Sequence, residues 1–117
     1  MRILIIDDDA IVGALLGEML DLMGHDVCSI ETSEPAGILA AARLRPDLLI
    51  VDVRLGRGSG ISVVRQVMID TPTPHLFVSG DLASVRIEMP LSAMLLKPYS
   101  EAQLASGIQR AIGATSH

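Results

Sequence analysis

The sequence predicts an α/β domain in which five β-strands alternate with helices, a (βα)5 arrangement. Two observations support this prediction. Short aliphatic runs, each too short for a helix, recur along the chain, and segments with apolar residues three to four positions apart lie between them. Strands that are separated by helices form a parallel sheet with helices on both faces. The length of 117 residues suits one domain, so we expect residues 1–117 to form a single unit.

The chain begins with an expected strand and an expected helix. Arg2–Ile6 (RILII) is apolar on both faces, as a buried parallel strand would be. Ala10–Met23 follows as a helix, and Gly24 ends it. The apolar residues that recur there at helical spacing are Ile11, Leu15, Met19 and Leu22.

A second strand and a second helix come next. His25–Ile30 (HDVCSI) predicts the strand. Ser33 then suits a helix N-cap and Pro35 suits the first turn, so we expect a helix that extends to about Leu44.

The third expected strand, Asp47–Val51 (DLLIV), is the most convincing buried strand of the chain. The glycine-rich residues 55–60 (LGRGSG) follow it, and their spacing does not match a dinucleotide-binding loop, so they predict a flexible loop. Ile61–Ile69 predicts a helix, and His75–Val78 (HLFV) predicts the fourth strand.

The last part of the chain predicts a weak helix, a strand and a long helix. Residues 81–91 have mixed polarity and contain Pro90, which allows a turn or two of helix at most. Ala93–Leu96 (AMLL) predicts the fifth strand, and Ser100 suits the N-cap of the final helix. The apolar face of that helix contains Leu104, Ile108 and Ile112.

The composition excludes several classes of function. The chain has 14 acidic and 9 basic residues, a formal charge of −5, which argues against a surface that binds nucleic acid. Its basic residues form no cluster that would bind a membrane, and no apolar run reaches the roughly 18–20 residues that cross a bilayer. The single cysteine, Cys28, cannot form an internal disulfide, and an acid at Asp7 interrupts any signal peptide. We therefore expect a cytoplasmic protein.

Polar residues follow four of the expected strands. Asp7 and Asp8 follow the first strand, Asp52 the third, Ser79 the fourth and Lys97 the fifth. Because the carboxyl ends of parallel strands meet at one edge of a sheet, function collects there. Carboxylates are ligands that Mg²⁺ prefers, while a lysine and a hydroxyl can stabilise a transferring phosphoryl group. Attack by a carboxylate on that group would give an acyl phosphate.

The order, spacing and strand context of these residues resemble the receiver domain of two-component response regulators, from about Arg2 to Ile112. The resemblance implies a flavodoxin-like, doubly wound parallel sheet with strand order 2-1-3-4-5. It implies a phosphoprotein of phosphorelay signal transduction, phosphorylated by a histidine kinase or a histidine phosphotransfer protein. Such a domain catalyses only its own phosphorylation and dephosphorylation, so we expect no enzyme that acts on an outside substrate.

The same resemblance assigns the acidic residues. Asp52 would be the phosphoacceptor. The ligands of Mg²⁺ would be Asp8 directly, Asp7 through water, Asp52 itself and the backbone carbonyl of Arg54. Asp9 has no such role, and we expect it to be the N-cap of the first helix.

The resemblance also assigns residues that switch or modulate the domain. Ser79 takes the place of the switch Thr or Ser, Lys97 takes that of the invariant lysine, and a cis peptide bond is expected before Pro98. In receivers, the positions of Arg54 and Asp81 flank the path of the hydrolytic water. We therefore expect these two residues to set the lifetime of the phosphoryl group.

Two features depart from the usual receiver pattern. Met94 stands where receivers usually carry Tyr or Phe, and the segment between Ser79 and Lys97 is shorter than usual. The short segment, Gly80 after the switch hydroxyl and the Lys-Pro-Tyr sequence at residues 97–99 resemble a group of atypical single-domain receivers from alphaproteobacteria. We expect a stand-alone receiver that signals to an unknown downstream protein by contact or by phosphorelay.

Two alternative functions remain open on the sequence. The Asp7-x-Asp9 pair, with Ser79 and Lys97, also resembles a small phosphatase of the haloacid dehalogenase type, in which Asp7 would be the nucleophile. Against it, a helix begins directly after the acids, and only Glu101 follows Lys97 as an acid. The other alternative is a degenerate receiver that acts only as an interaction module.

Overall fold

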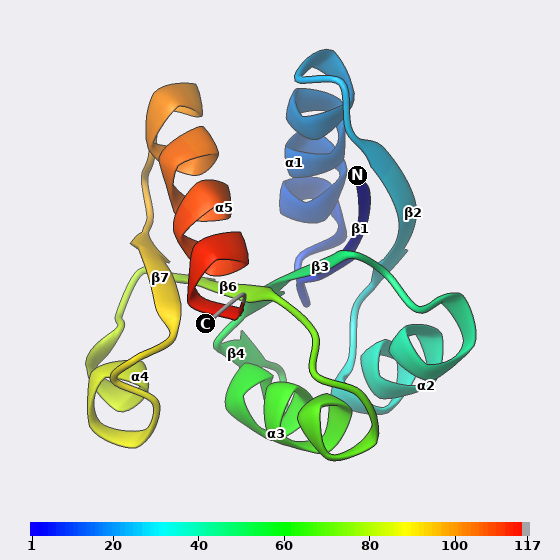
Figure 1. Ribbon diagram of the computed structural model, residues 1–117, viewed down its shortest axis with the longest axis vertical. Helices are drawn as coiled ribbons and strands as arrows, with labels where there is room; N and C mark the ends of the chain where they lie inside the picture. Colours follow the sequence, from blue (N-terminus) through cyan, green and yellow to red (C-terminus); the bar gives the residue numbers. More distant parts are fainter. Residues whose placement is uncertain (116–117) are drawn as a thin grey trace.

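The computed structural model of the protein describes residues 1–115. A five-stranded parallel sheet lies between two layers of helices (Figure 1). Its strands are β1 (Arg2–Ile6), β2 (Asp26–Glu31), β3 (Leu48–Asp52), β6 (His75–Ser79) and β7 (Ala93–Leu96). Their order across the sheet is β2-β1-β3-β6-β7, and neighbouring strands are parallel. The predicted doubly wound sheet and its 2-1-3-4-5 order are confirmed.

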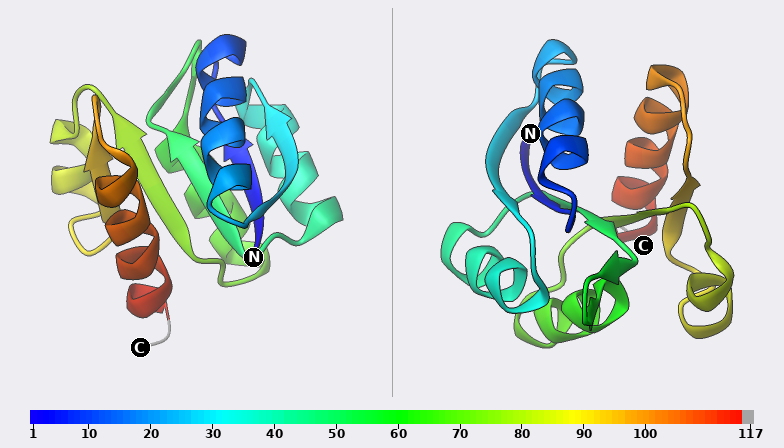
Figure 2. Two further views of the ribbon diagram at one scale, coloured as in Figure 1. Left: turned by 90° about the horizontal axis from the view of Figure 1, so that it is seen from above. Right: turned by 180° about the vertical axis from the view of Figure 1, so that it is seen from behind.

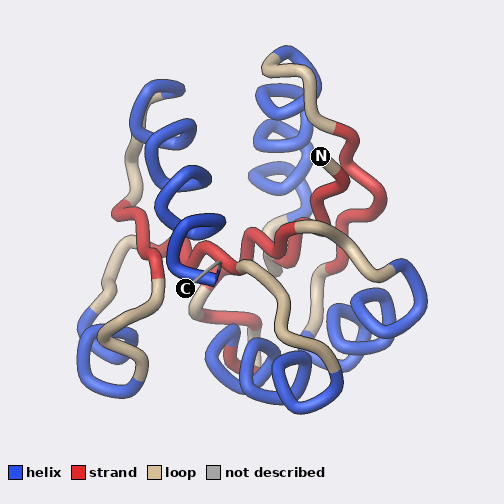
Figure 3. Tube along the Cα trace, viewed as in Figure 1, coloured by secondary structure: helices blue, strands red, loops and turns tan. Residues whose placement is uncertain are grey.

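Helices follow the strands of this sheet along the chain, as the tube in Figure 3 shows. They are α1 (Ala10–Leu22), α2 (Glu34–Leu44), α3 (Gly60–Asp70), α4 (Ala83–Glu88) and α5 (Glu101–Thr115). Helices α1 and α5 cover one face of the sheet, and α2, α3 and α4 lie on the other (Figures 1 and 2). Among the described residues, no helix has the length and apolar character that a membrane crossing requires.

The sheet is buried on both faces because alternate side chains of each strand enter separate cores. In β1, Ile3 and Ile5 pack in the core beneath α1 and α5, while Leu4 and Ile6 pack in the core beneath α2, α3 and α4. All four are fully buried. This two-sided burial explains the continuous apolar runs of the sequence, and it holds the carboxyl ends of the strands in place.

The serine caps of two helices are confirmed. The Ser33 hydroxyl accepts a hydrogen bond from the Ala36 N–H at the start of α2. At the start of α5, the Ser100 hydroxyl accepts from the Gln103 N–H, and the Gln103 side chain accepts from the Ser100 N–H. These contacts satisfy backbone donors that a helix start leaves without partners.

Of the four apolar residues that predicted α1, only Met19 packs against the core, and it is partly buried. The side chains of Ile11, Leu15 and Leu22 are exposed, at 74%, 59% and 89%. The buried residues of α1 are Gly13, Leu16, Gly17 and Leu20. Two glycines on that face let the helix lie close to the sheet, which the apolar spacing alone could not indicate.

The glycine-rich segment is a hairpin rather than the expected flexible loop. Strands β4 (Arg54–Leu55) and β5 (Gly58–Ser59) pair antiparallel outside the main sheet. Gly56, in the turn between them, has a φ of 61°, a conformation that glycine adopts without strain. The hairpin connects β3 to α3 directly beside the carboxyl edge of the sheet.

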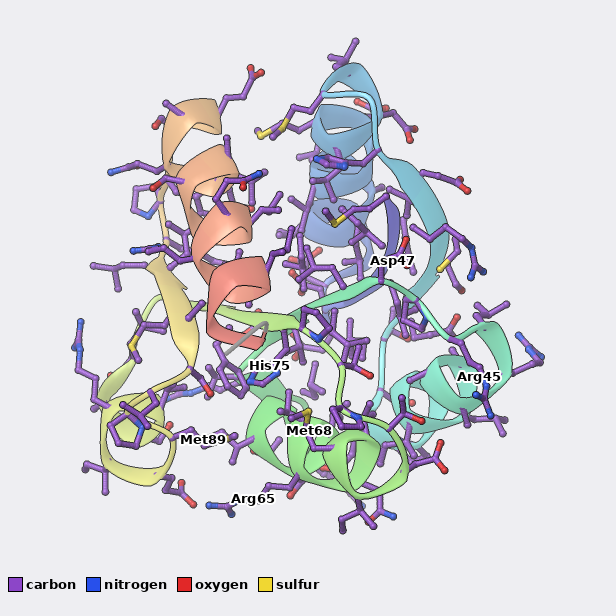
Figure 4. The ribbon with its side chains drawn as sticks, viewed as in Figure 1. Arg45, Asp47, Arg65, Met68, His75 and Met89 are labelled. Atoms are coloured by element: carbon purple, nitrogen blue, oxygen red, sulfur yellow. The ribbon has the colours of Figure 1, made fainter. Side chains whose placement is uncertain are left out.

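The weak helix expected in residues 81–91 is confirmed as α4, which has 6 residues. An ion pair joins it to its neighbour α3, because Arg65 lies 3.3 Å from Glu88. Figure 4 shows Arg65 extending from α3 toward α4. Both side chains are about half exposed, so solvent screens this pair and it contributes little stability.

The close approach of Gly60, at the start of α3, to the end of β3 predicts that Gly60→Ala destabilises the protein. A Cβ atom at Gly60 would lie 2.1 Å from the carbonyl oxygen of Asp52, a contact that only a backbone shift could relieve. We expect the free energy of unfolding to fall by roughly 2–4 kcal/mol, measured by urea denaturation.

Gly113→Ala is the matched control for this measurement. An added Cβ at this position in α5 meets no atom within 4 Å. The substitution should leave the stability unchanged or increase it by up to about 1 kcal/mol. Equal stabilities of the two variants would contradict the steric role of Gly60.

Candidate functional site

Four strands of the sheet deliver the polar side chains of the site to one edge. Asp7 and Asp8 follow β1, Asp52 ends β3, Ser79 ends β6 and Lys97 follows β7. Strands β1, β3, β6 and β7 are consecutive neighbours in the sheet, so their carboxyl ends lie next to one another. The backbone N–H of Lys97 also donates to the carbonyl of Ser79 at 2.8 Å.

Three carboxylates form a cluster at this edge. Asp7, Asp8 and Asp52 each contribute one oxygen, and these oxygens all lie within 4.8 Å of one another. Asp7 is buried, Asp52 is half-buried and Asp8 is exposed. Asp9 is not part of this cluster. Its carboxylate accepts hydrogen bonds from two backbone amides in the first turn of α1. The prediction that Asp9 is the N-cap of this helix is confirmed.

Lys97 contacts two members of the carboxylate cluster. Its Nζ lies 2.9 Å from Oδ2 of Asp52 and 3.5 Å from Oδ2 of Asp7. Burial alone would lower the pKa of Lys97, but the hydrogen bond and charge of Asp52, with the charge of Asp7, outweigh it and raise this pKa. Lys97 therefore remains a cation at the edge of the cluster.

Asp7 is the buried member of the cluster, with 4% of its surface exposed. Burial is the main cause that raises the pKa of its carboxyl, and the charge of Asp52 adds to it. The Asp9 N–H, 2.9 Å from Oδ1 of Asp7, and the Lys97 ammonium act in the opposite direction. An additional cation would stabilise the ionised form of this carboxyl.

Backbone amides orient the other two carboxylates. The Arg54 N–H donates to Oδ1 of Asp52 at 3.1 Å, and the Gly56 N–H donates to Oδ2 of Asp8 at 3.1 Å. Both amides belong to the β4–β5 hairpin and its turn. The hairpin is therefore attached to two members of the cluster, and it carries the Arg54 backbone next to Asp52.

Ser79 is buried, with 4% of its surface exposed. Its hydroxyl accepts a hydrogen bond from the Asp81 N–H at 3.2 Å, which leaves the hydroxyl proton able to donate elsewhere. Gly80, which follows, is exposed, and an added Cβ there would meet no atom within 4 Å. The backbone directly after Ser79 is therefore exposed, although Ser79 itself is buried.

The remaining residues singled out in the sequence lie around the cluster. The Arg54 side chain is exposed, and the carboxylate of Asp81 accepts from the Ala83 N–H at the start of α4. Met94 pairs with a residue inside β6 and packs against the core on the α2, α3 and α4 face, so the structure does not bring it into the cluster. The peptide bond between Lys97 and Pro98 is cis.

The sequence predicted no role in the site for two further residues, Tyr99 and Glu34. Tyr99 is half-buried, and burial is the main cause that raises its pKa. The charge of Lys97 lowers this pKa, and the charges of Asp7 and Asp52 raise it. Glu34, the first residue of α2, hydrogen-bonds to the hairpin at Ser59. The position of Tyr99, two residues after Lys97, was the one available signal, and Glu34 gave none.

Comparison with known proteins is consistent with this site. The family model "Response regulator receiver domain" matches residues 3–109. A curated relative from Syntrophus aciditrophicus, "Protein-glutamate methylesterase/protein-glutamine glutaminase 1", is 34% identical over 96 residues, covering 80% of this chain and 27% of that protein. The "Regulatory protein VirG" of Agrobacterium tumefaciens is 27% identical over 117 residues, covering 95% and 43%. The chain spans less than half the length of each.

Solved structures share the fold. A response regulator receiver domain from Clostridium thermocellum matches with a TM-score of 0.86 and 24% identity, over 98% of this chain and 96% of that one. The receiver domain of the PhyR response regulator from Erythrobacter litoralis matches with a TM-score of 0.82 and 24% identity, over 96% and 89%.

The burial of Asp7 predicts that Asp7→Asn stabilises the metal-free protein. Burial and the charge of Asp52 disfavour the ionised carboxyl, whereas an amide oxygen can still accept from the Asp9 N–H. We expect Tm in EDTA, followed by circular dichroism, to rise by roughly 2–6 °C, as about 1 kcal/mol would cause in a domain of this size.

The matched control is Asp26→Asn at an exposed position in β2, which should leave Tm unchanged. A lower Tm for Asp7→Asn would mean that its contact with Lys97 outweighs its burial.

Proposed function

The chain belongs to the response regulator receiver domain family, and we propose that it accepts a phosphoryl group on Asp52. The observation that carries this proposal is the position of the Lys97 ammonium at the edge of the three-carboxylate cluster, 2.9 Å from Asp52. A carboxylate nucleophile needs a fixed cation nearby, because the phosphoryl group that approaches it is itself negatively charged.

The donor set of the cluster fits Mg²⁺, which prefers carboxylate and carbonyl oxygens. We propose that Asp7, Asp8 and Asp52 hold this ion together with the backbone carbonyl of Arg54. When bound, Mg²⁺ supplies positive charge that balances the phosphoryl oxygens. The exposed Asp8 leaves the cluster accessible from solvent, and the buried Asp7 fixes its inner side.

Asp52, Lys97 and Ser79 each have a different role in the proposed phosphoryl transfer. An oxygen of Asp52 forms the new bond to phosphorus while the bond to the leaving nitrogen of the donor histidine breaks. Lys97 moves its hydrogen bond from the carboxylate to the phosphoryl oxygens as the charge shifts. The hydroxyl of Ser79 donates to one of those oxygens, which draws the segment after β6 toward the site.

We propose a histidine kinase or a histidine phosphotransfer protein as the donor. A protein donor must dock beside the carboxyl edge, and exposed apolar side chains lie there. Ile11 and Leu15, one turn apart on α1, are 74% and 59% exposed and follow Asp8 closely in the chain. They offer contact area that a charged edge alone would lack.

We propose that the phosphorylated domain signals through a downstream protein, by contact or by relay of the phosphoryl group, and acts on no outside substrate. The movement at Ser79 would reach Met94, since β6 and β7 are paired and Met94 packs in the adjoining core. A partner that binds the altered surface better would favour the phosphorylated form in return.

Phosphorylation by a small donor tests the proposal directly. Incubation with acetyl phosphate and Mg²⁺, followed by intact mass, should add one phosphoryl group to the wild type. Asp52→Asn should remain unlabelled, because the nucleophile is lost, and omission of Mg²⁺ should prevent labelling of the wild type.

The other outcomes separate the alternatives. Labelling that survives Asp52→Asn but is lost in Asp7→Asn would place the nucleophile after β1, as in a phosphatase of the haloacid dehalogenase type. A protein that neither acetyl phosphate nor a panel of histidine kinases labels would be a degenerate interaction module.

The exposed Arg54 predicts a long-lived phosphoryl group. Its guanidinium can hydrogen-bond to a phosphoryl oxygen and obstruct the attacking water. We expect Arg54→Asn to lose phosphate roughly fivefold faster, which corresponds to about 1 kcal/mol for one hydrogen bond. Loss of mass with time after removal of the donor measures the rate. Arg57→Asn, in the turn of the same hairpin, is the control, and slower loss from Arg54→Asn would contradict the assignment.

A further inference from the structure

Glu34 connects the start of α2 to the hairpin beside the site. It is the first residue of α2, directly after the N-cap Ser33. Its Oε1 accepts a hydrogen bond from the backbone N–H of Ser59 in β5 at 2.8 Å. The helix dipole favours a carboxylate in the first turn of a helix, and a carboxylate oxygen is a strong acceptor for a backbone N–H.

The hairpin is shaped to receive this side chain. A Cβ atom at Gly58 would lie 2.7 Å from Cβ of Glu34 and 2.8 Å from its Oε1. Only a glycine leaves room for the carboxylate to lie against β5. The contact is therefore a close fit between two segments that are 25 residues or so apart in the chain.

The hairpin has little stability of its own. Each strand contains 2 residues, and isolated hairpins of that size do not persist in water. Its position therefore depends on contacts with the rest of the domain. In β4, Leu55 is buried in the core and the Arg54 N–H donates to Asp52. Asp8 holds the turn through the Gly56 N–H, and Glu34 holds β5 through the Ser59 N–H. Ser59 pairs with Arg54 across the hairpin, so an anchor on Ser59 also fixes Arg54.

We propose that Glu34 is a positioning residue, which fixes the β4–β5 hairpin so that the Arg54 carbonyl faces the carboxylate cluster and raises its affinity for Mg²⁺. This inference rests on the proposed function, because it assigns Arg54 to the metal site. Glu34 itself touches neither the metal nor the phosphoryl group. It acts through the hairpin alone.

The experiment compares Glu34→Ala with Glu34→Gln, which keeps an oxygen acceptor. Amide hydrogen exchange of Ser59, followed by NMR without metal, reports the contact itself. Calorimetry reports the dissociation constant for Mg²⁺. In Glu34→Ala we expect Ser59 to exchange roughly tenfold faster, as loss of one charged hydrogen bond would cause. The dissociation constant should rise about tenfold, as is typical when a residue that supports a ligand is removed.

Three further variants make the result specific. Glu34→Gln should stay close to the wild type in both measurements. Gly58→Ala, which keeps the Glu34 charge but fills its space, should reproduce the loss. Glu101→Ala removes a carboxylate from the first residue of α5 and controls for charge at a helix start; it should change neither quantity.

Wild-type values for both Glu34→Ala and Gly58→Ala would overturn the inference. Equal losses in Glu34→Ala and Glu101→Ala would also overturn it, because they would indicate a general charge effect. A wild type that binds no Mg²⁺ and accepts no phosphoryl group would overturn the proposed function instead, and Ser59 exchange would still decide whether Glu34 holds the hairpin.

Discussion

The crowding of three carboxylates at one edge of the sheet is the constraint on which the rest of the site depends. Asp7, Asp8 and Asp52 place oxygens within 4.8 Å of one another, where like charges repel. Lys97 offsets part of that repulsion through its contacts with Asp52 and Asp7, and its own pKa rises although burial opposes it. Lys97 leaves part of the repulsion among the carboxylates uncompensated, so a further cation bound between them would stabilise the site.

Two kinds of support hold the site, and they differ in rigidity. The carboxylates and the lysine stand at the ends of strands whose side chains are buried on both faces, so their backbones cannot shift without disturbing two cores. The β4–β5 hairpin has one side chain in a core, that of Leu55, and is otherwise held by hydrogen bonds to the side chains of Asp52, Asp8 and Glu34. The backbone near Arg54 is therefore held by fewer buried side chains than the strand ends, and by more hydrogen bonds to side chains of the site.

The sequence predicted the strands that form continuous apolar runs, and it missed the two-residue strands of the hairpin. Arg2–Ile6 and Ala93–Leu96 match their strands residue for residue, because two-sided burial leaves a continuous aliphatic run. The strand order came from the resemblance to receiver domains rather than from periodicity. The hairpin was missed because two-residue strands carry no period, and the contact of Glu34 with Ser59 joins residues that no local pattern relates. In α1, the spacing indicated a helix, but the glycines decided which face is buried.

The three consecutive acids after β1 are tolerated because the chain turns from a strand into a helix there, and each acid meets a different donor. Asp7 continues inward from the strand and contacts the Lys97 ammonium. Asp8 lies in solvent and accepts from the turn of the hairpin, while Asp9 accepts from the first amides of α1. The three adjacent acids therefore have three different environments: Asp7 is buried beside Lys97, Asp8 is exposed to solvent, and Asp9 caps α1. The same three residues in a continuous strand would alternate between its two faces. Both faces of this sheet are buried, so carboxylates would enter an apolar core on each.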